Sequence, residues 1–169
     1  MSDRIWLALR SIAWTALLPG FFAGFVPWRY FGLAHVQLTL RNPIHVLGLM
    51  GIGVGVMLLA SCIWQFAYSG RGTLAPVDPP RQLVVRGPYR FVRNPMYAAV
   101  TAIVLGEVLL TRSVALLTYW AIWFAFVNLF VIGYEEPTLR RRFGASYERY
   151  TRTVGRWIPR WPDRLSSRQ

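Results

Sequence analysis

Two short polar clusters interrupt an otherwise apolar sequence, and their residue types could bind and align a charged ligand. The first runs from Gly87 to Tyr97 and reads Gly-Pro-Tyr-Arg-Phe-Val-Arg-Asn-Pro-Met-Tyr. The second begins about forty residues after the first, at Glu135 and Glu136, where an apolar run ends and an arginine-rich tail begins. If the two apolar runs between the clusters form a helical hairpin, both clusters emerge at the same end of it. We interpret that end as the candidate active site.

The first cluster has the composition of an anion site. A helix that begins at Pro95 presents free backbone N–H groups, and Arg90 and Arg93 precede it directly. The two glutamates of the second cluster can hydrogen-bond a ribose diol or an amino group. Aromatic faces for a flat base or a cation come from Tyr89, Tyr97, Tyr147 and Tyr150. S-adenosylmethionine, with its carboxylate, sulfonium cation, ribose and adenine, would use all of these groups.

The same residues also have a purely structural interpretation. Asn94 and Pro95 are typical of the cap and the first turn of a helix. Arginines next to apolar runs anchor helices to lipid headgroups, and an acidic pair can simply end a span. The residue types alone therefore leave both interpretations open.

The composition indicates a membrane protein. The chain has 169 residues, 54% of them hydrophobic, and a net charge of +12, a length that fits one domain over residues 1–169. All 19 basic residues are arginines, and most of them flank apolar runs, so we expect no nucleic-acid partner. His35, His45 and the lone Cys62 have no neighbouring ligands at metal-binding spacing, so we expect no metal.

Apolar runs predict about four transmembrane helices, over residues 5–26, 44–68, 95–110 and 114–134. In the first, Pro19-Gly20 predicts a kink. In the second, Asn42 and Pro43 are expected at the cap and first turn. Close helix packing is predicted from two Gly-x-x-x-Gly pairs, Gly20 with Gly24 and Gly51 with Gly55.

The predicted architecture also includes the loop between the second and third spans and the tail after the acidic pair. Residues 69–93 are expected to form a non-helical loop, extended at Asp78-Pro79-Pro80. Pro137 is expected to restart a helix after the acidic pair. An apolar stripe on that arginine-rich helix predicts that it lies in the membrane surface. The stripe consists of Leu139, Phe143, Tyr147, Tyr150 and Val154.

The arginines also predict the orientation. Four spans put both termini and the loop between the second and third spans on one side, which carries sixteen of the 19 arginines. The other side carries Arg29, Arg41 and Arg112. The positive-inside rule then places the termini and the cofactor-binding regions 70–97 and 135–160 in the cytoplasm, and we expect a bacterial inner membrane.

Several motifs occur in order between about residues 70 and 160: Gly87-Pro88-Tyr89-Arg90, Arg93-Asn94-Pro95-Met96-Tyr97, Glu135-Glu136-x-x-Leu139, Phe143-Gly144 and Tyr147-x-x-Tyr150. Together they resemble the signature of the isoprenylcysteine carboxyl methyltransferase family and of the related membrane phospholipid methyltransferases. The resemblance implies an all-α integral membrane enzyme that uses S-adenosylmethionine and releases S-adenosylhomocysteine. It also implies a cofactor pocket between the start of the third span and Glu135-Glu136, closed by the tail helix.

The resemblance assigns roles to residues of this chain. The candidate catalytic residues are Glu135, Glu136 and Asn94, and the candidate cofactor-binding residues are Tyr89, Arg90, Arg93, Asn94, Pro95, Tyr97, Glu135, Glu136, Tyr147 and Tyr150. Eukaryotic family members carry histidine where this chain has Asn94. Asparagine still donates and accepts hydrogen bonds, but it has no imidazole for proton transfer.

The methyl acceptor is expected to be a lipid-like or other hydrophobic small molecule. Methyl transfer is a direct displacement that needs donor and acceptor aligned and water excluded. A carboxylate acceptor is already ionised, whereas an amine must lose a proton, for which Glu135 or Glu136 is the candidate base. Arg141 or Arg142 could hold an anionic substrate or face lipid headgroups. Membrane lipids are the other expected partner, and monomer and dimer both stay open.

Two alternatives to a methyltransferase stay open at this point. One is a non-catalytic membrane accessory protein that retains the fold, which the absence of the family histidine at Asn94 would allow. The other is a small four-span exporter. An exporter usually needs an ionisable group in mid-membrane, and here Glu107 lies near the end of a span.

Overall fold

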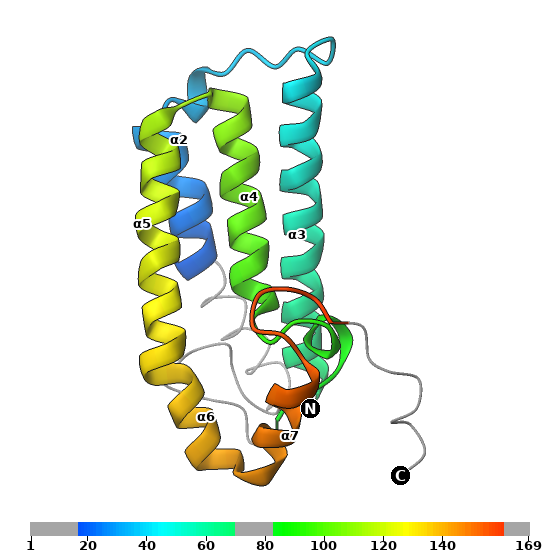
Figure 1. Ribbon diagram of the computed structural model, residues 1–169. Helices are drawn as coiled ribbons and strands as arrows, with labels where there is room; N and C mark the ends of the chain where they lie inside the picture. The colour runs from blue at the N-terminus through cyan, green and yellow to red at the C-terminus, as the bar shows by residue number, and fades with distance from the viewer. Residues whose placement is uncertain (1–16, 70–82, 161–169) are drawn as a thin grey trace, which may run out of the picture.

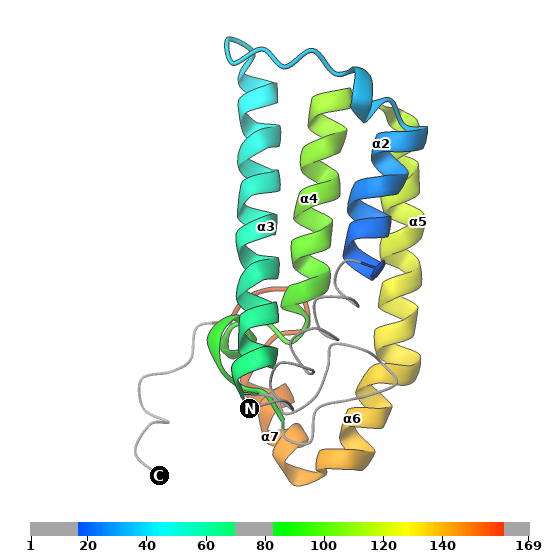
Figure 2. The same cartoon turned by 180° about the vertical axis from the view of Figure 1, so that it is seen from behind.

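Helices dominate the computed structural model, which describes residues 17–69 and 83–160 (Figure 1). Three long helices, α3 (Pro43–Ser69), α4 (Pro95–Thr111) and α5 (Val114–Phe130), run side by side. Figure 2, the view from behind, also places α4 between α3 and α5. No strand occurs in the described part of the chain, which confirms the all-α prediction there.

The first predicted span is described from Leu17 onward. Its last helical segment, α2 (Val26–Tyr30), extends four residues beyond the predicted end at residue 26. A short 3-10 helix, η2 (Leu33–His35), follows. In both views α2 packs on the side of α4 that faces α5 (Figures 1 and 2).

A π-helical turn, η1 (Phe21–Phe25), directly follows Pro19-Gly20, where the sequence predicted a kink. This turn lies between Pro19 and Pro27, two residues that have no N–H to donate, and a wider turn is a common response to such gaps. Within it, the Phe22 carbonyl accepts a 2.9 Å hydrogen bond from the Tyr119 hydroxyl of α5. The irregular turn therefore ties the first helix to α5.

The helix start predicted from the sequence is confirmed for α3 and confirmed only in part for α4. The Asn42 side chain accepts a 3.0 Å hydrogen bond from the Ile44 N–H, as a cap does. Helix α4 begins at Pro95, as predicted. Asn94 precedes it, but its side chain makes no capping hydrogen bond to the helix.

Helices α3 and α4 approach closely where glycine faces glycine. A Cβ on Gly106 would meet the Gly48 carbonyl oxygen at 2.5 Å, and one on Gly55 would meet the Ala99 carbonyl oxygen at 2.7 Å. Gly51 has more room, with its nearest neighbour at 3.5 Å. A Cβ on Gly24 would meet no described atom within 4 Å, so the described helices do not show the close packing predicted for that glycine.

Gly55→Leu is expected to destabilise the protein by about 2–3 kcal/mol, because its side chain must displace the backbone of α4. The melting temperature in detergent should fall by roughly 5–10 °C. Gly53→Leu on the same helix is the matched control, since a Cβ there would meet no described atom within 4 Å. An equal loss of stability in both variants would contradict the proposed glycine contact.

Helix α5 continues into the tail without a break. A second π-helical turn, η4 (Val131–Glu135), joins it directly to α6 (Glu136–Phe143). The prediction that Pro137 restarts a separate helix is therefore wrong. Pro137 lacks the N–H that would bond four residues back, and the widened turn before it accommodates that loss.

The tail breaks instead at Gly144, whose positive φ of 48° ends α6 before α7 (Ala145–Thr153) begins. The apolar stripe predicted on this tail forms one cluster, but Tyr147 and Tyr150 are buried and Leu83 of the loop packs against them. The protein itself covers most of this stripe, so the prediction that it lies in the membrane surface is wrong for these residues.

The loop between the second and third predicted spans is described only from residue 83 onward, so Asp78-Pro79-Pro80 lies outside the described residues. It contains a 3-10 helix, η3 (Gly87–Arg90), where the sequence predicted no helix. Val92 then forms an isolated parallel bridge with Gly155, which follows α7. The loop is thereby attached to the end of the tail.

Within residues 17–69 and 83–160, two helical stretches are long and apolar enough to cross a membrane by length and composition, Pro43–Gln65 and Val114–Phe143. Helix α4 is apolar but shorter, with 17 residues. Large apolar side chains on α3, such as Leu47, Met50 and Met57, are exposed, as expected for a lipid-facing surface. The membrane character is therefore supported, and the count of four spans stays a prediction.

Candidate active site

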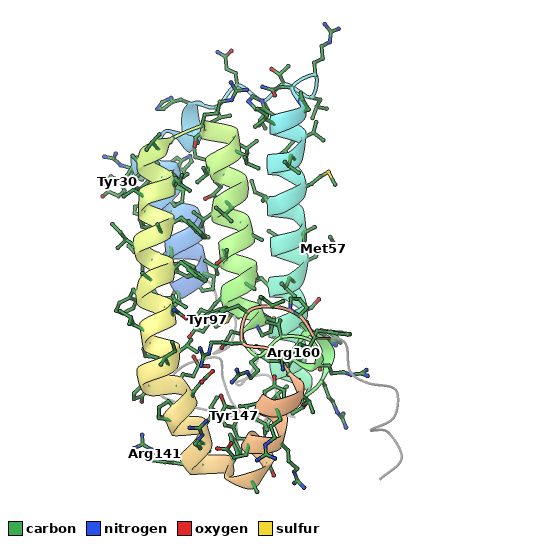
Figure 3. The ribbon with its side chains drawn as sticks, in the orientation of Figure 1. Tyr30, Met57, Tyr97, Arg141, Tyr147 and Arg160 are labelled. Atoms are coloured by element: carbon green, nitrogen blue, oxygen red, sulfur yellow. The ribbon has the colours of Figure 1, made fainter. Side chains whose placement is uncertain are left out.

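The hairpin of α4 and α5 brings the two polar clusters together, as the sequence predicted. Arg93, two residues before α4, donates from Nη1 to Glu136 Oε1 at 2.8 Å. Tyr97, in the first turn of α4, donates its hydroxyl to Glu135 Oε2 at 3.1 Å. Figure 3 shows Tyr97 and Tyr147 at this same end of the helices, far from Tyr30.

Glu136 is held by two arginines. Besides Arg93, Arg156 binds it in a bidentate manner, with Nε to Oε1 at 2.7 Å and Nη2 to Oε2 at 2.8 Å. The side chains of Arg93 and Glu136 are each 13% exposed, so this ion pair is largely shielded from water. The hydrogen bonds to Glu136 raise the pKa of Arg156, and the two guanidinium groups together neutralise the carboxylate.

Glu135 has a different environment, although it is the residue directly before Glu136. Its Oε2 accepts the hydrogen bond from Tyr97, and its Oε1 accepts none from the described residues. Within the same part of the chain, no basic side chain lies at ion-pair distance from Glu135. Glu136 is thus already neutralised, whereas Glu135 retains an oxygen that can accept from a ligand.

The segment after α7, residues 154–160, closes the site; we refer to it as the C-terminal strap. The backbone N–H of Arg93 donates to the Gly155 carbonyl at 2.8 Å, and that of Arg160 donates to the Phe91 carbonyl at 2.9 Å. Asn94, which is 7% exposed, donates from Nδ2 to the Arg156 carbonyl at 3.2 Å. The role of Asn94 in the structure is therefore to hold the strap, in place of the capping role predicted for it.

Three of the predicted tyrosines form the support of the site. The Tyr150 hydroxyl donates to the Tyr89 carbonyl at 2.7 Å, which fixes η3 on α7. The rings of Tyr147 and Tyr150 lie 6.2 Å apart, and Tyr89 packs in a buried cluster with Cys62. Burial raises the pKa of Tyr147 and that of Tyr150, so both are neutral phenols at physiological pH.

Some predicted arginines lie apart from this cluster. Arg90 is exposed, and its guanidinium lies over the ring of Phe91 at 6.0 Å. Arg141 and Arg142 are exposed on α6, and Figure 3 shows Arg141 pointing away from the other helices. Neither Arg141 nor Arg142 makes an ion pair with a described residue, whereas their neighbour Arg140 pairs with Glu148. They do not line the cluster around Glu136.

Three residues that were not predicted complete the site: Arg156, Trp157 and Asn128. Arg156 provides most of the hydrogen bonds to Glu136, yet in the sequence it is one of nine arginines after the last span. Trp157 donates from Nε1 to Asn128 Oδ1 at 3.0 Å, which joins the strap to α5. The available signal was Asn128 itself, an amide within an apolar helix, because such a group needs a hydrogen-bond partner.

A family model described as phospholipid methyltransferase matches residues 40–146, which include α3, α4, α5 and both polar clusters. The chain belongs to the phospholipid methyltransferase family. A search of curated proteins finds no match. Phospholipid methyltransferases are grouped with the isoprenylcysteine carboxyl methyltransferases, so the predicted resemblance is confirmed. Membership supports a methyltransferase role at a membrane.

In this phospholipid methyltransferase family member, Arg93 and Glu135 each retain a polar group that could bind a ligand. Arg93 Nε is buried and has no hydrogen-bond partner among the described residues, so it retains a donor for a ligand oxygen. Glu135 offers an acceptor beside the aromatic ring of Tyr97. No group of three or more potential metal ligands occurs in the described part of the chain.

Proposed function

We propose that the protein is an S-adenosylmethionine-dependent methyltransferase whose acceptor is a lipid-like or other hydrophobic small molecule with a carboxylate or an amine. The supporting observation is a pair of contacts between the two polar clusters: Arg93 binds Glu136 and Tyr97 binds Glu135, beside the C-terminal strap. The family match supports the same class of reaction.

In this proposal, Arg93 and Glu135 bind the cofactor, and Tyr97 orients Glu135. Arg93 Nε would donate to an oxygen of the ligand, and the free Glu135 oxygen would accept from a hydroxyl or an amino group. S-adenosylmethionine would supply a methyl group on a cationic sulfur. The cation is favoured near the Glu135 carboxylate and the faces of the tyrosine rings.

The need for a base depends on the acceptor. A carboxylate is ionised at neutral pH and attacks without losing a proton, so the protein has only to align it and exclude water. An amine must lose a proton, and Glu135 is the better candidate because Glu136 is engaged by Arg93 and Arg156. Asn94 cannot take a proton, and its side chain is engaged with the strap.

The proposal also includes the orientation of the protein in the membrane. With four spans, the excess of arginines on the side of the termini favours a site that faces the cytoplasm, where S-adenosylmethionine is made. The acceptor would reach the site from the bilayer.

The test is saturable binding of S-adenosylhomocysteine to the purified protein in detergent, measured by calorimetry. We expect one site per chain with a dissociation constant in the micromolar range, which corresponds to about −8 kcal/mol. The alternative, a non-catalytic accessory protein, predicts no binding. Membranes with and without the protein, supplied with methyl-labelled methionine, should then differ in a labelled hydrophobic product, and binding without any such product would contradict the enzyme.

A further inference from the structure

Asn128 is an unusual residue for its position in α5. It lies seven residues before Glu135, which at the helical rise is about 10 Å further into the apolar part of the helix. A polar amide in such surroundings is unfavourable unless it is hydrogen-bonded. Its Oδ1 accepts from the Trp157 indole at 3.0 Å, so a residue of the strap accounts for its presence.

Trp157 connects the two helices of the hairpin at this depth. Its ring centroid lies 6.4 Å from that of Tyr97 on α4 and 5.2 Å from that of Phe124 on α5. Tyr97 in turn donates to Glu135. A single side chain from the strap therefore stands between the acidic end of the site and the apolar surface further along α5.

The aromatic contacts continue away from the site. Phe124 stacks on Trp120 with centroids 5.7 Å apart and planes at 15°. The Trp120 Nε1 is buried and has no hydrogen-bond partner within the described residues. We refer to these four side chains as the aromatic row: Tyr97, Trp157, Phe124 and Trp120. The row begins beside Glu135 and ends at the Trp120 N–H, which has no acceptor among the described residues.

We propose that Trp157 determines the specificity for the methyl acceptor and that Asn128 is the positioning residue that holds its indole. In this arrangement the apolar part of the acceptor lies against the aromatic row, and an acceptor oxygen takes the N–H of Trp120. Trp157 sets the distance between that apolar part and the reacting end at Glu135. The proposal rests on the proposed function and adds to it the residues that select the acceptor.

The test compares Trp157→Ala, Trp157→Phe and Asn128→Leu with the control Trp28→Phe, an exposed tryptophan. Labelled S-adenosylmethionine and vesicles made from the lipid extract of the host membrane are the probes. Trp157→Ala and Asn128→Leu should raise the KM for the acceptor at least about tenfold, the typical loss on removing an aromatic anchor. The dissociation constant for S-adenosylhomocysteine should change by less than about threefold, a split that a structural defect of the strap would not produce.

A double-mutant cycle tests the role of Asn128. In the Trp157→Phe background, which keeps a ring but lacks the N–H, Asn128→Leu should add no further change in KM. Three results would each overturn the proposal. In the first, Asn128→Leu changes the acceptor KM further in the Trp157→Phe background, and in the second, the acceptor KM of Trp157→Ala is unchanged. In the third, the variants lose affinity for S-adenosylhomocysteine as much as for the acceptor. If the wild-type protein binds S-adenosylhomocysteine but methylates nothing in the vesicles, the proposed function fails and this inference fails with it.

Discussion

Replacing Arg93 by alanine is expected to weaken S-adenosylhomocysteine binding by on the order of 100-fold, which corresponds to about 2.7 kcal/mol. The loss has two sources. The Arg93 Nε donor, buried and without a partner among the described residues, is removed from the site. The 2.8 Å ion pair with Glu136 is also lost, and hydrogen bonds between charged groups contribute about 1.5–3 kcal/mol each.

The fold should survive this change, because the backbone of residue 93 still donates to the Gly155 carbonyl and Arg156 still binds Glu136 at two points. We expect a decrease in melting temperature of less than roughly 5 °C in detergent. Calorimetry measures the affinity, and Arg90→Ala is the matched control, an exposed arginine three residues earlier on the same loop. Equal affinity in the two variants would remove Arg93 from the site.

The regular part of the architecture could be predicted because it depends on local rules. Proline at the first helical position and an apolar run predict the start of α4 at Pro95, and both features lie in adjacent residues. The break between the predicted spans 95–110 and 114–134 is also local: α4 ends at Thr111, Arg112 follows with a positive φ of 52°, and Ser113 caps α5. The meeting of the two polar clusters then follows from the hairpin.

The predictions that were wrong concern residues whose hydrogen-bond or packing partners lie far away in the chain. Asn94 has the right type and position for a cap, but its amide donates to the Arg156 carbonyl 62 residues later. No local pattern distinguishes these outcomes. The tail stripe is similar, since amphipathic periodicity predicts an apolar face but does not say whether lipid or Leu83 covers it. Arg156 was not predicted because its contacts are with Glu136 and Asn94, both distant in the chain.

The environments of the acidic pair also suggest a division of roles that the sequence did not resolve. Glu136 is enclosed by Arg93 and Arg156, both within 2.8 Å, and its charge balances theirs. Glu135 has a tyrosine hydroxyl as its neighbour and one oxygen without a partner among the described residues. One carboxylate thus assembles the strap, and the other is available to the ligand.

This division predicts opposite outcomes for two matched substitutions. Glu136→Gln leaves two cationic arginines without a counter-charge, so we expect a loss of about 2 kcal/mol in stability and a lower melting temperature by roughly 5 °C. Glu135→Gln keeps the acceptor for the Tyr97 hydroxyl and removes no ion pair between described residues, so its melting temperature should change by less than about 2 °C. Methyl transfer should nevertheless fall by on the order of 100-fold or more in Glu135→Gln.

Scanning calorimetry and a labelled-methyl assay on the same two preparations separate these effects. The ligand titration then identifies the step that Glu135 serves. If Glu135→Gln still binds S-adenosylhomocysteine and regains transfer as the pH rises, Glu135 is the base for an amine, because a higher pH deprotonates the amine without it. If binding itself is lost at every pH, Glu135 holds the cofactor. A stable, fully active Glu135→Gln protein beside an inactive Glu136→Gln protein would reverse the roles that the arginine contacts assign.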